Sequence, residues 1–415
     1  MLNQEFQQKL RKYAQLVVRK GCNIQPGQEF LITANIDVIE FVRMLSEEAY
    51  LAGAKRVTVR LTDEQTTRIG LDYMSIEEFE RFPDWLALLH NMTAREGGAV
   101  LRVESSDPQA MTGVDPMKVV ANQRASQQAC KEYYDAINHS RLVWCIVGAA
   151  APAWASRVYP DIDIESATER LWDAIFQTVR VDQDDPISAW EDHRQSFSRR
   201  SQWLNDMKFD ALRFKNSLGT DLTIGLNDAG IWKGGGDALI DGTYFFPNMP
   251  TEEIFTSPSR LRAEGVVYSS LPLVYNGNII DKFSLSFERG KVVQCYAEQG
   301  LDILQSIFAI DDAASSLGEV SLVPWSSPIQ QSGILFLSTL FDENAACHLA
   351  LGLGFPDCLE GGTELDDDAL KAAGVNKSAT HVDFMIGTAD MSVVGITNEG
   401  KEVEVFVDGE WAGGL

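Results

Sequence analysis

The chain has few of the residues that build structural zinc modules or disulfide scaffolds. It contains five histidines in 415 residues, and its six cysteines are widely spaced and form no CxxC pair. Zinc modules use closely spaced cysteines, and disulfide scaffolds are small and rich in cysteine, so neither class fits. We therefore expect reduced core thiols and a cytoplasmic protein.

Two further kinds of segment are missing. No apolar run approaches the about 20 residues that a membrane-spanning helix needs. No GxGxxG or GxxxxGKS/T pattern follows any predicted strand, so nucleotide binding has no motif support. We expect no membrane partner.

Positive charge is scarce as well. The chain has 60 acidic residues against 35 basic ones, which gives a formal net charge of −25. Such a field repels nucleic acid and anionic membranes, and it attracts cations, whether metal ions or substrates that carry an amine. Acidic surfaces also serve solubility alone, and the composition leaves both explanations open. We expect no nucleic-acid partner.

The first half of the chain alternates helices with apolar strands. Strands are predicted at residues 29–35, 56–63, 99–106 and 142–150, with helical segments between them. This β-α-β alternation is typical of a mostly parallel sheet covered by helices. We predict an N-terminal α/β domain over residues 1–190.

The pattern changes to short alternating strands after a polar helical segment near residues 185–200. Residues 211–226 are predicted to form a hairpin and further strand pairs follow, while helices are predicted at about 299–308 and 341–353. We predict a C-terminal α+β domain, rich in antiparallel strands, over residues 191–415.

This second half contains a scattered set of metal-ligand side chains in apolar or turn-forming sequence. They are Glu253, Glu319, Glu343, His348, His381 and Asp383. Buried charged side chains are costly unless they are paired or bind a cation. Two imidazoles and several carboxylates form the ligand set of a hydrolytic dinuclear metal centre.

His381 and Asp383 form the clearest pair among these residues. They lie in the apolar segment HVDFMIG, and alternate side chains of a strand share one face. His348 is expected in the helix at 341–353, about 140° around the axis from Glu343, so the two share no face unless Glu343 lies at a frayed start. Each residue taken alone also fits an ordinary structural position. The remaining histidines are expected to be structural: His90, His139 and His193.

Four sequence blocks resemble signature segments of the thermophilic-type metalloaminopeptidases, the aminopeptidase T and aminopeptidase S family. The blocks are PNMPTEEIFTSP, LGEVSLVPWSSPI, LFDENAACHLALG and HVDFMIG, in the family's order and spacing. The resemblance covers most of the chain. It implies a two-domain homodimer that removes N-terminal residues from peptide substrates with two divalent metal ions, typically zinc or cobalt, with magnesium or manganese as alternatives.

The resemblance also implies roles for residues of this chain. The implied metal ligands are Glu253, Glu319, Glu343, His348, His381 and Asp383. Glu319 is implied to bridge the two ions. Glu319 and Glu343 are both candidates for the catalytic proton acceptor, and the sequence does not choose between them.

One position departs from the family pattern. The family commonly has a tyrosine near the metals, shortly after the histidine segment, and this chain has Phe355 there, in GLGFPD. The missing hydroxyl would affect the rate or the substrate range and would leave the ligands intact. The alternative is that Phe355 is an ordinary core residue.

These observations together predict a metal-dependent aminopeptidase that uses a dinuclear metal-activated water. Two alternatives stay open. One is a dinuclear hydrolase of another amide or ester, and the other is a catalytically weakened, metal-containing binding protein. The complete ligand set argues against the second, since drift after loss of function would erode the ligands as well.

Overall fold

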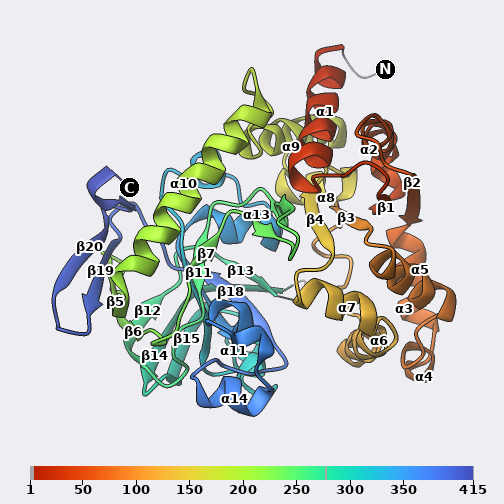
Figure 1. Cartoon of the computed structure of the whole chain (residues 1–415). Helices are drawn as coiled ribbons and strands as arrows, with labels where there is room; N and C mark the ends of the chain where they lie inside the picture. Colours follow the sequence, from red (N-terminus) through yellow and green to blue (C-terminus); the bar gives the residue numbers. More distant parts are fainter. Residues whose placement is uncertain (1–3, 276–277, 415) are drawn as a thin grey trace. The chain divides into compact units, whose positions relative to one another are not determined.

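A computed structural model describes residues 4–275 and 278–414 of the chain (Figure 1). Its backbone forms two compact units. The first comprises the chain up to Asp192 together with Gly236–Pro250, and the second comprises His193–Gly235 together with the chain from Thr251 onward. Over the described residues, no helix is both long and apolar enough to cross a bilayer.

The first unit is built on a parallel sheet. In the described part of the chain its strand order is β10-β4-β3-β1-β2, and each neighbouring pair runs parallel. The strands are β1 (Glu29–Asn35), β2 (Arg56–Thr62), β3 (Ala99–Glu104), β4 (Val143–Gly148) and β10 (Asn248–Met249). The predicted parallel α/β fold of this region is confirmed.

Helices cover both faces of the parallel sheet. The connections from β1 to β2 and from β2 to β3 run in opposite directions along the sheet, so right-handed crossovers put α2 and α5 on opposite faces. The helices are α1 (Gln4–Leu16), α2 (Ile39–Leu51), α3 (Glu64–Tyr73), α4 (Ile76–Phe79), α5 (Asp84–Arg95), α6 (Pro116–Ala129), α7 (Lys131–Asn138), α8 (Pro152–Val158) and α9 (Ile164–Thr178).

Aromatic packing joins the helices on the α2 face. The rings of Tyr13 in α1 and Phe41 in α2 stack with centroids 4.9 Å apart, and Phe41 meets Trp172 of α9 at 5.8 Å. On the other face, Leu31 and Val100 pack in a separate cluster with residues of α5 and α7. Apolar residues on both faces of the strands explain why these segments form the interior of a three-layer unit.

The segment Gly236–Pro250 joins the first unit although the sequence pattern suggested a single division of the chain. The segment contains a small hairpin of β8 (Asp237–Ala238) and β9 (Tyr244–Phe245), followed by β10. β10 extends the parallel sheet, with Asn248 opposite Ile146 and Met249 opposite Val147. Two-residue strands leave no readable pattern in the sequence. The division into domains 1–190 and 191–415 stays a prediction.

The second unit contains two sheets of antiparallel strands. The large sheet, in the described residues, comprises β5 (Phe209–Lys215), β6 (Asp221–Gly225), β12 (Ala263–Tyr268), β13 (Leu273–Tyr275), β14 (Asn278–Glu288), β15 (Lys291–Gln299), β19 (Ser392–Thr397), β20 (Glu402–Val407) and β21 (Glu410–Trp411). The small sheet has the order β18-β17-β16-β11-β7. Its strands are β7 (Lys233–Gly234), β11 (Ile254–Thr256), β16 (Leu317–Leu322), β17 (His348–Gly352) and β18 (His381–Met385).

The two sheets of this unit share one hydrophobic core. Phe283 of the large sheet and Phe384 of the small sheet lie 5.5 Å apart between ring centroids, and both belong to the same buried cluster as Val320 and Leu349. Helical segments complete the unit: α10 (Pro186–Met207), which begins in the first unit, α11 (Leu301–Phe308), α12 (Pro328–Ser332), α13 (Thr339–Asp342), the 3₁₀ turns η3 (Glu343–Ala345) and η4 (Pro356–Cys358), and α14 (Asp367–Ala372). The predicted α+β character is confirmed.

The predicted helix at 341–353 is wrong. The helix α13 ends at Asp342, the turn η3 follows, and His348 begins the strand β17. Leucine and alanine in this apolar run favour a helix by intrinsic propensity. The run instead pairs with β16 on one side and β18 on the other, and this pairing outweighs a propensity worth only tenths of a kcal/mol per residue.

Candidate metal centre

The small sheet has one face in the core, and the opposite face carries polar and charged side chains. Side chains alternate along a strand, so Leu349 and Leu351 point into the core while His348 and Ala350 point the other way. The strand register places Glu319 and Asp383 on either side of Ala350, and Ser321 opposite His348. One small alanine therefore lies between two carboxylates.

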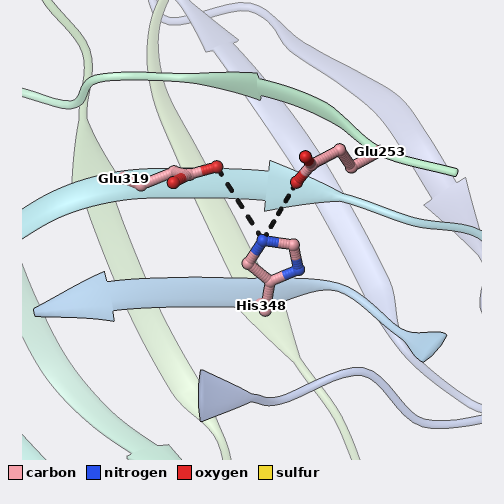
Figure 2. Close-up of side chains that lie close together, drawn as sticks. All are labelled: Glu253, Glu319 and His348. Carbon is pink, nitrogen blue, oxygen red and sulfur yellow. Dashed lines mark ion pairs between the residues drawn. The ribbon is translucent and has the colours of Figure 1, made fainter. Parts of the chain in front are cut away.

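Three side chains form a first group on this face. Glu253, in the loop just before β11, places Oε2 3.1 Å from His348 Nε2, and Glu319 Oε1 lies 3.8 Å from the same nitrogen. Figure 2 shows both carboxylates directed toward this ring nitrogen, Glu319 from the left and Glu253 from the right. Ser321 donates a hydrogen bond from Oγ to Glu253 Oε2 at 3.1 Å.

Three side chains form a second group, and Glu319 belongs to both. His381 Nε2 lies 3.2 Å from Glu319 Oε2 and 3.1 Å from Asp383 Oδ1. In each group, one ligand atom per residue lies within 4.8 Å of the others. Glu319 thus directs one oxygen toward each histidine.

The other ring nitrogens of the two histidines face backbone carbonyls. His381 Nδ1 lies 2.7 Å from the carbonyl oxygen of Leu353, and His348 Nδ1 lies 3.3 Å from that of Ala346. A carbonyl only accepts hydrogen bonds, so each Nδ1 carries the proton and donates it. This leaves Nε2 of the neutral ring free to bind a cation, which is the usual arrangement of metal-binding histidines.

Glu343 lies beside the two groups, in the turn η3. Burial raises the pKa of Glu343 well above its usual value, and the negative charges of Glu253 and Asp383 raise it further. A neutral donor, Asn344 Nδ2, lies 3.4 Å from Glu343 Oε1. The carboxylates of the cluster therefore influence the pKa of Glu343, although Glu343 belongs to neither group.

Burial and repulsion also govern the other titratable groups. Burial raises the pKa of Glu253, with Glu319 adding to the effect and His348 opposing it. Burial disfavours the charged form of His381, but Asp383 and Glu319 outweigh this and raise its pKa to about 11. Hydrogen bonding to Glu253 and Glu319 likewise raises the pKa of His348 well above its usual value despite burial.

Asp383 shows the opposite shift. Burial opposes its ionisation, but the attraction of His381 outweighs burial and lowers the pKa of Asp383 below its usual value. Each histidine therefore holds a proton more strongly, and the carboxylate beside His381 stays ionised. Both effects show that the site has a negative potential that favours positive charge.

The donor set fits divalent metal ions. With both imidazoles neutral, the four carboxylates of the cluster carry four negative charges, which two divalent cations would balance. The four carboxylates are Glu253, Glu319, Glu343 and Asp383. Mixed imidazole and carboxylate ligands suit zinc and related transition ions, whereas magnesium and calcium favour oxygen ligands alone.

The structure brings the sequence candidates together in the second unit. Five of them form the two groups and Glu343 lies beside them: Glu253, Glu319, His348, His381 and Asp383. Their individual roles stay predictions. The expected angular separation of Glu343 and His348 does not apply, because His348 lies in a strand. Phe355 has its ring centroid 5.0 Å from that of His381 and 5.8 Å from that of Phe255, so it lies beside the second group.

Sequence reasoning missed polar residues that support the cluster. Ser321 lies two residues after Glu319 in a strand, so the period-two rule could have found it. His193, taken as structural, has Nε2 2.8 Å from the carbonyl oxygen of Thr251 and 3.5 Å from Glu252 Oε2. These contacts join segments about 60 residues apart, and no local pattern predicts them.

Comparisons with known proteins cover nearly the whole chain. The thermophilic metalloprotease family (M29) matches residues 6–411. Aminopeptidase AmpS of Bacillus subtilis (strain 168) is 43% identical over 407 residues, which cover 98% of this chain and 99% of that protein. Aminopeptidase T of Thermus thermophilus is 42% identical over 406 residues, with coverage of 98% and 99%. A solved structure of wild-type AmpT from Thermus thermophilus is similar with a TM-score of 0.91 and 41% identity, covering 98% of this chain and 100% of that one.

The raised pKa values of His348 and His381 predict that metal binding releases protons. In the metal-free protein at pH 7 His381 is protonated, because its pKa is about 11, and hydrogen bonding to Glu253 and Glu319 favours the protonated form of His348. A metal binds only the neutral ring, so we expect at least one proton per chain to be released on saturation with Zn²⁺. The contribution of His381 to metal affinity should rise with pH and level off only above about pH 11, where the ring has lost its proton.

Calorimetric titrations in two buffers of different ionisation enthalpy measure this proton release. The exposed His139, in the first unit, supplies the control, and His139→Gln should release as many protons as the unchanged protein. Release of no protons at pH 7 would contradict histidine ligation.

Proposed function

Because the chain belongs to the thermophilic metalloprotease family (M29), we propose that its cluster holds two divalent metal ions and releases N-terminal residues from peptides. The relatives named above are aminopeptidases, and the comparisons support a metal-dependent aminopeptidase. The observation that carries the dinuclear proposal is the position of Glu319 in both ligand groups. Zinc and cobalt suit its mixed nitrogen and oxygen donors, with magnesium or manganese less suited.

Each group would hold one ion. Glu253 and His348 would hold the first, His381 and Asp383 the second, and Glu319 would bind both with its two oxygens. Divalent ions bound here supply Lewis acidity and lower the pKa of a coordinated water toward 7.

Glu343 is the better of the two candidates for moving the proton. Both oxygens of Glu319 face imidazole nitrogens, so both would serve as metal ligands and neither would be free to accept a proton. Glu343 lies outside the two groups, and burial raises its pKa above the usual value, which makes this carboxylate a stronger base. We expect Glu343 to take a proton from the attacking water and pass it to the leaving amine.

A substrate with a free N-terminus also suits a site that holds metal ions. The lone pair of an unprotonated α-amine could bind one of the ions. The nitrogen of an acetylated N-terminus belongs to an amide and is a poor ligand. The preference for the first residue of a peptide would follow from this contact.

The assembly and location follow the family resemblance. We propose a cytoplasmic homodimer with a peptide substrate. The six cysteines are all free thiols, as expected of a reducing compartment.

The function is tested with paired substrates. Metal content is measured on the purified protein, and hydrolysis is compared for aminoacyl-anilides with a free amine and for their N-acetylated forms. We expect turnover of the free-amine substrates alone, and loss of turnover after treatment with a chelator. Equal hydrolysis of the acetylated substrates would favour a hydrolase of other amides or esters.

Glu319→Ala is expected to abolish turnover and to leave the fold intact. The substitution removes the carboxylate shared by both groups, so neither site keeps its full ligand set. Activity assays, metal analysis and circular dichroism check the three parts of this expectation. Glu298→Ala, which removes an exposed carboxylate paired with Lys282, should keep full activity and metal content. Near-normal turnover in Glu319→Ala would refute the shared role.

Phe355→Tyr is expected to raise kcat. The ring lies beside His381, and a phenolic hydroxyl there can donate a hydrogen bond to the oxyanion that forms in amide hydrolysis. One such donor is worth about 100–1000-fold in other hydrolases, which sets the upper limit. Phe255→Tyr, on the neighbouring ring, serves as the control for a hydroxyl added nearby. Unchanged kcat in Phe355→Tyr would mean that Phe355 only packs.

A further inference from the structure

Asn344 is a completely buried residue that touches two segments of the metal centre. It follows Glu343 in the turn η3, and its exposed fraction is 0%. The backbone N–H of Glu252 donates to Asn344 Oδ1 at 2.7 Å. A backbone N–H can only donate, so the oxygen of the carboxamide must face Glu252 and its NH₂ group must face the other way.

The NH₂ group of Asn344 lies within hydrogen-bond distance of two oxygens, both in residues just before Asn344 in the chain. Nδ2 lies 3.2 Å from the carbonyl oxygen of Leu340 and 3.4 Å from Glu343 Oε1. The backbone carbonyl of Asn344 in turn accepts a hydrogen bond from Ser327 Oγ at 2.6 Å. One side chain thus joins the segment that presents Glu253 to the turn that presents Glu343.

We propose that Asn344 is a positioning residue for metal binding, which holds the carboxylates of Glu253 and Glu343 at a fixed separation. This inference rests on the proposed dinuclear function. Both side chains are carboxylates, so they repel each other when they are ionised. Without a link between their segments, repulsion would favour a wider separation whenever no cation is bound.

A neutral amide suits this role better than a charged side chain. Asparagine offers an acceptor to Glu252 and donors to Glu343 and Leu340 without adding charge to the cluster. Aspartate would lose both donors and add a further negative charge beside Glu343. Leucine would fill a similar volume and leave the buried N–H of Glu252 without its partner, which is unfavourable because the group has lost its contact with water.

A second buried asparagine in the same unit shows what a purely structural role looks like. Asn376 is 1% exposed, and its Nδ2 lies near three backbone carbonyl oxygens, those of Ala313, Ser316 and Gly352. It contacts no carboxylate of the cluster in the described residues. Asn376 is therefore a matched control, similar in burial and in number of hydrogen bonds.

The test measures metal binding and does not depend on peptide hydrolysis. Metal-free protein is titrated with Zn²⁺ and with Co²⁺ in a calorimeter, and the visible spectrum of the Co²⁺ form is recorded. We expect Asn344→Ala to raise the Kd by about 10–100-fold, the usual effect of removing a group that orients a metal ligand. The Co²⁺ spectrum should change too, because the geometry of the two carboxylates is no longer fixed. We expect Asn376→Ala to lower the unfolding temperature and to leave the Kd and the spectrum unchanged.

The outcomes separate the two proposals. If the unchanged protein binds no divalent ion, the proposed function fails and the role of Asn344 fails with it. If it binds ions and Asn344→Ala has the same Kd and spectrum, or if Asn376→Ala weakens binding as much, Asn344 is only structural and the proposed function stands. Should Asn344→Ala not fold, Asn344→Ser, which retains one hydroxyl, enters the same comparison and is judged by the same results.

Discussion

The second unit places four carboxylates close together, two of them buried and two half-buried, and their mutual repulsion is the constraint on which the metal centre depends. Glu253, Glu319 and Asp383 flank two imidazoles, and Glu343 lies beside them. Water screens such charges poorly in a buried site. Burial raises the pKa values of Glu253 and Glu343, and the neighbouring carboxylates add to this effect. Attraction to the carboxylates raises the pKa values of both histidines despite burial. A proton bound to any of these groups relieves part of the repulsion. Divalent cations relieve it more completely than protons do.

The small sheet stabilises this arrangement of charges because one of its faces packs in the core and the other carries the charged side chains. One face packs Val320, Leu349 and Phe384 into the core shared with the large sheet. Strands fixed in this way hold the side chains of the other face at set positions, so the carboxylates cannot move apart easily. Neutral polar side chains also help to hold the carboxylates in position. Ser321 and Asn344 hydrogen-bond to Glu253 and Glu343 respectively without adding charge.

The sequence predicted much of this fold where a local pattern reports on local structure. The parallel strands of the first unit, the hairpin β5–β6 and the strand of His381 and Asp383 all appear where periodicity placed them. It failed at residues 348–352, where leucine and alanine favour a helix and two neighbouring strands impose β17. It also gave no sign that Gly236–Pro250 joins the first unit, because β10 is too short to show a period.

The same distinction holds for the candidate site. The residue types and the four sequence blocks were enough to select six ligand candidates, since buried carboxylates and histidines in apolar sequence need a counter-charge whatever the fold. Only the tertiary structure decided that Glu319 faces both histidines, that Phe355 lies beside His381, and that Asn344 joins the segments of Glu253 and Glu343. These relations depend on strand register and on contacts between residues about 30 to 90 positions apart. Such contacts produce no periodic pattern in a single sequence, whereas the sequence states the chemical type of each side chain directly.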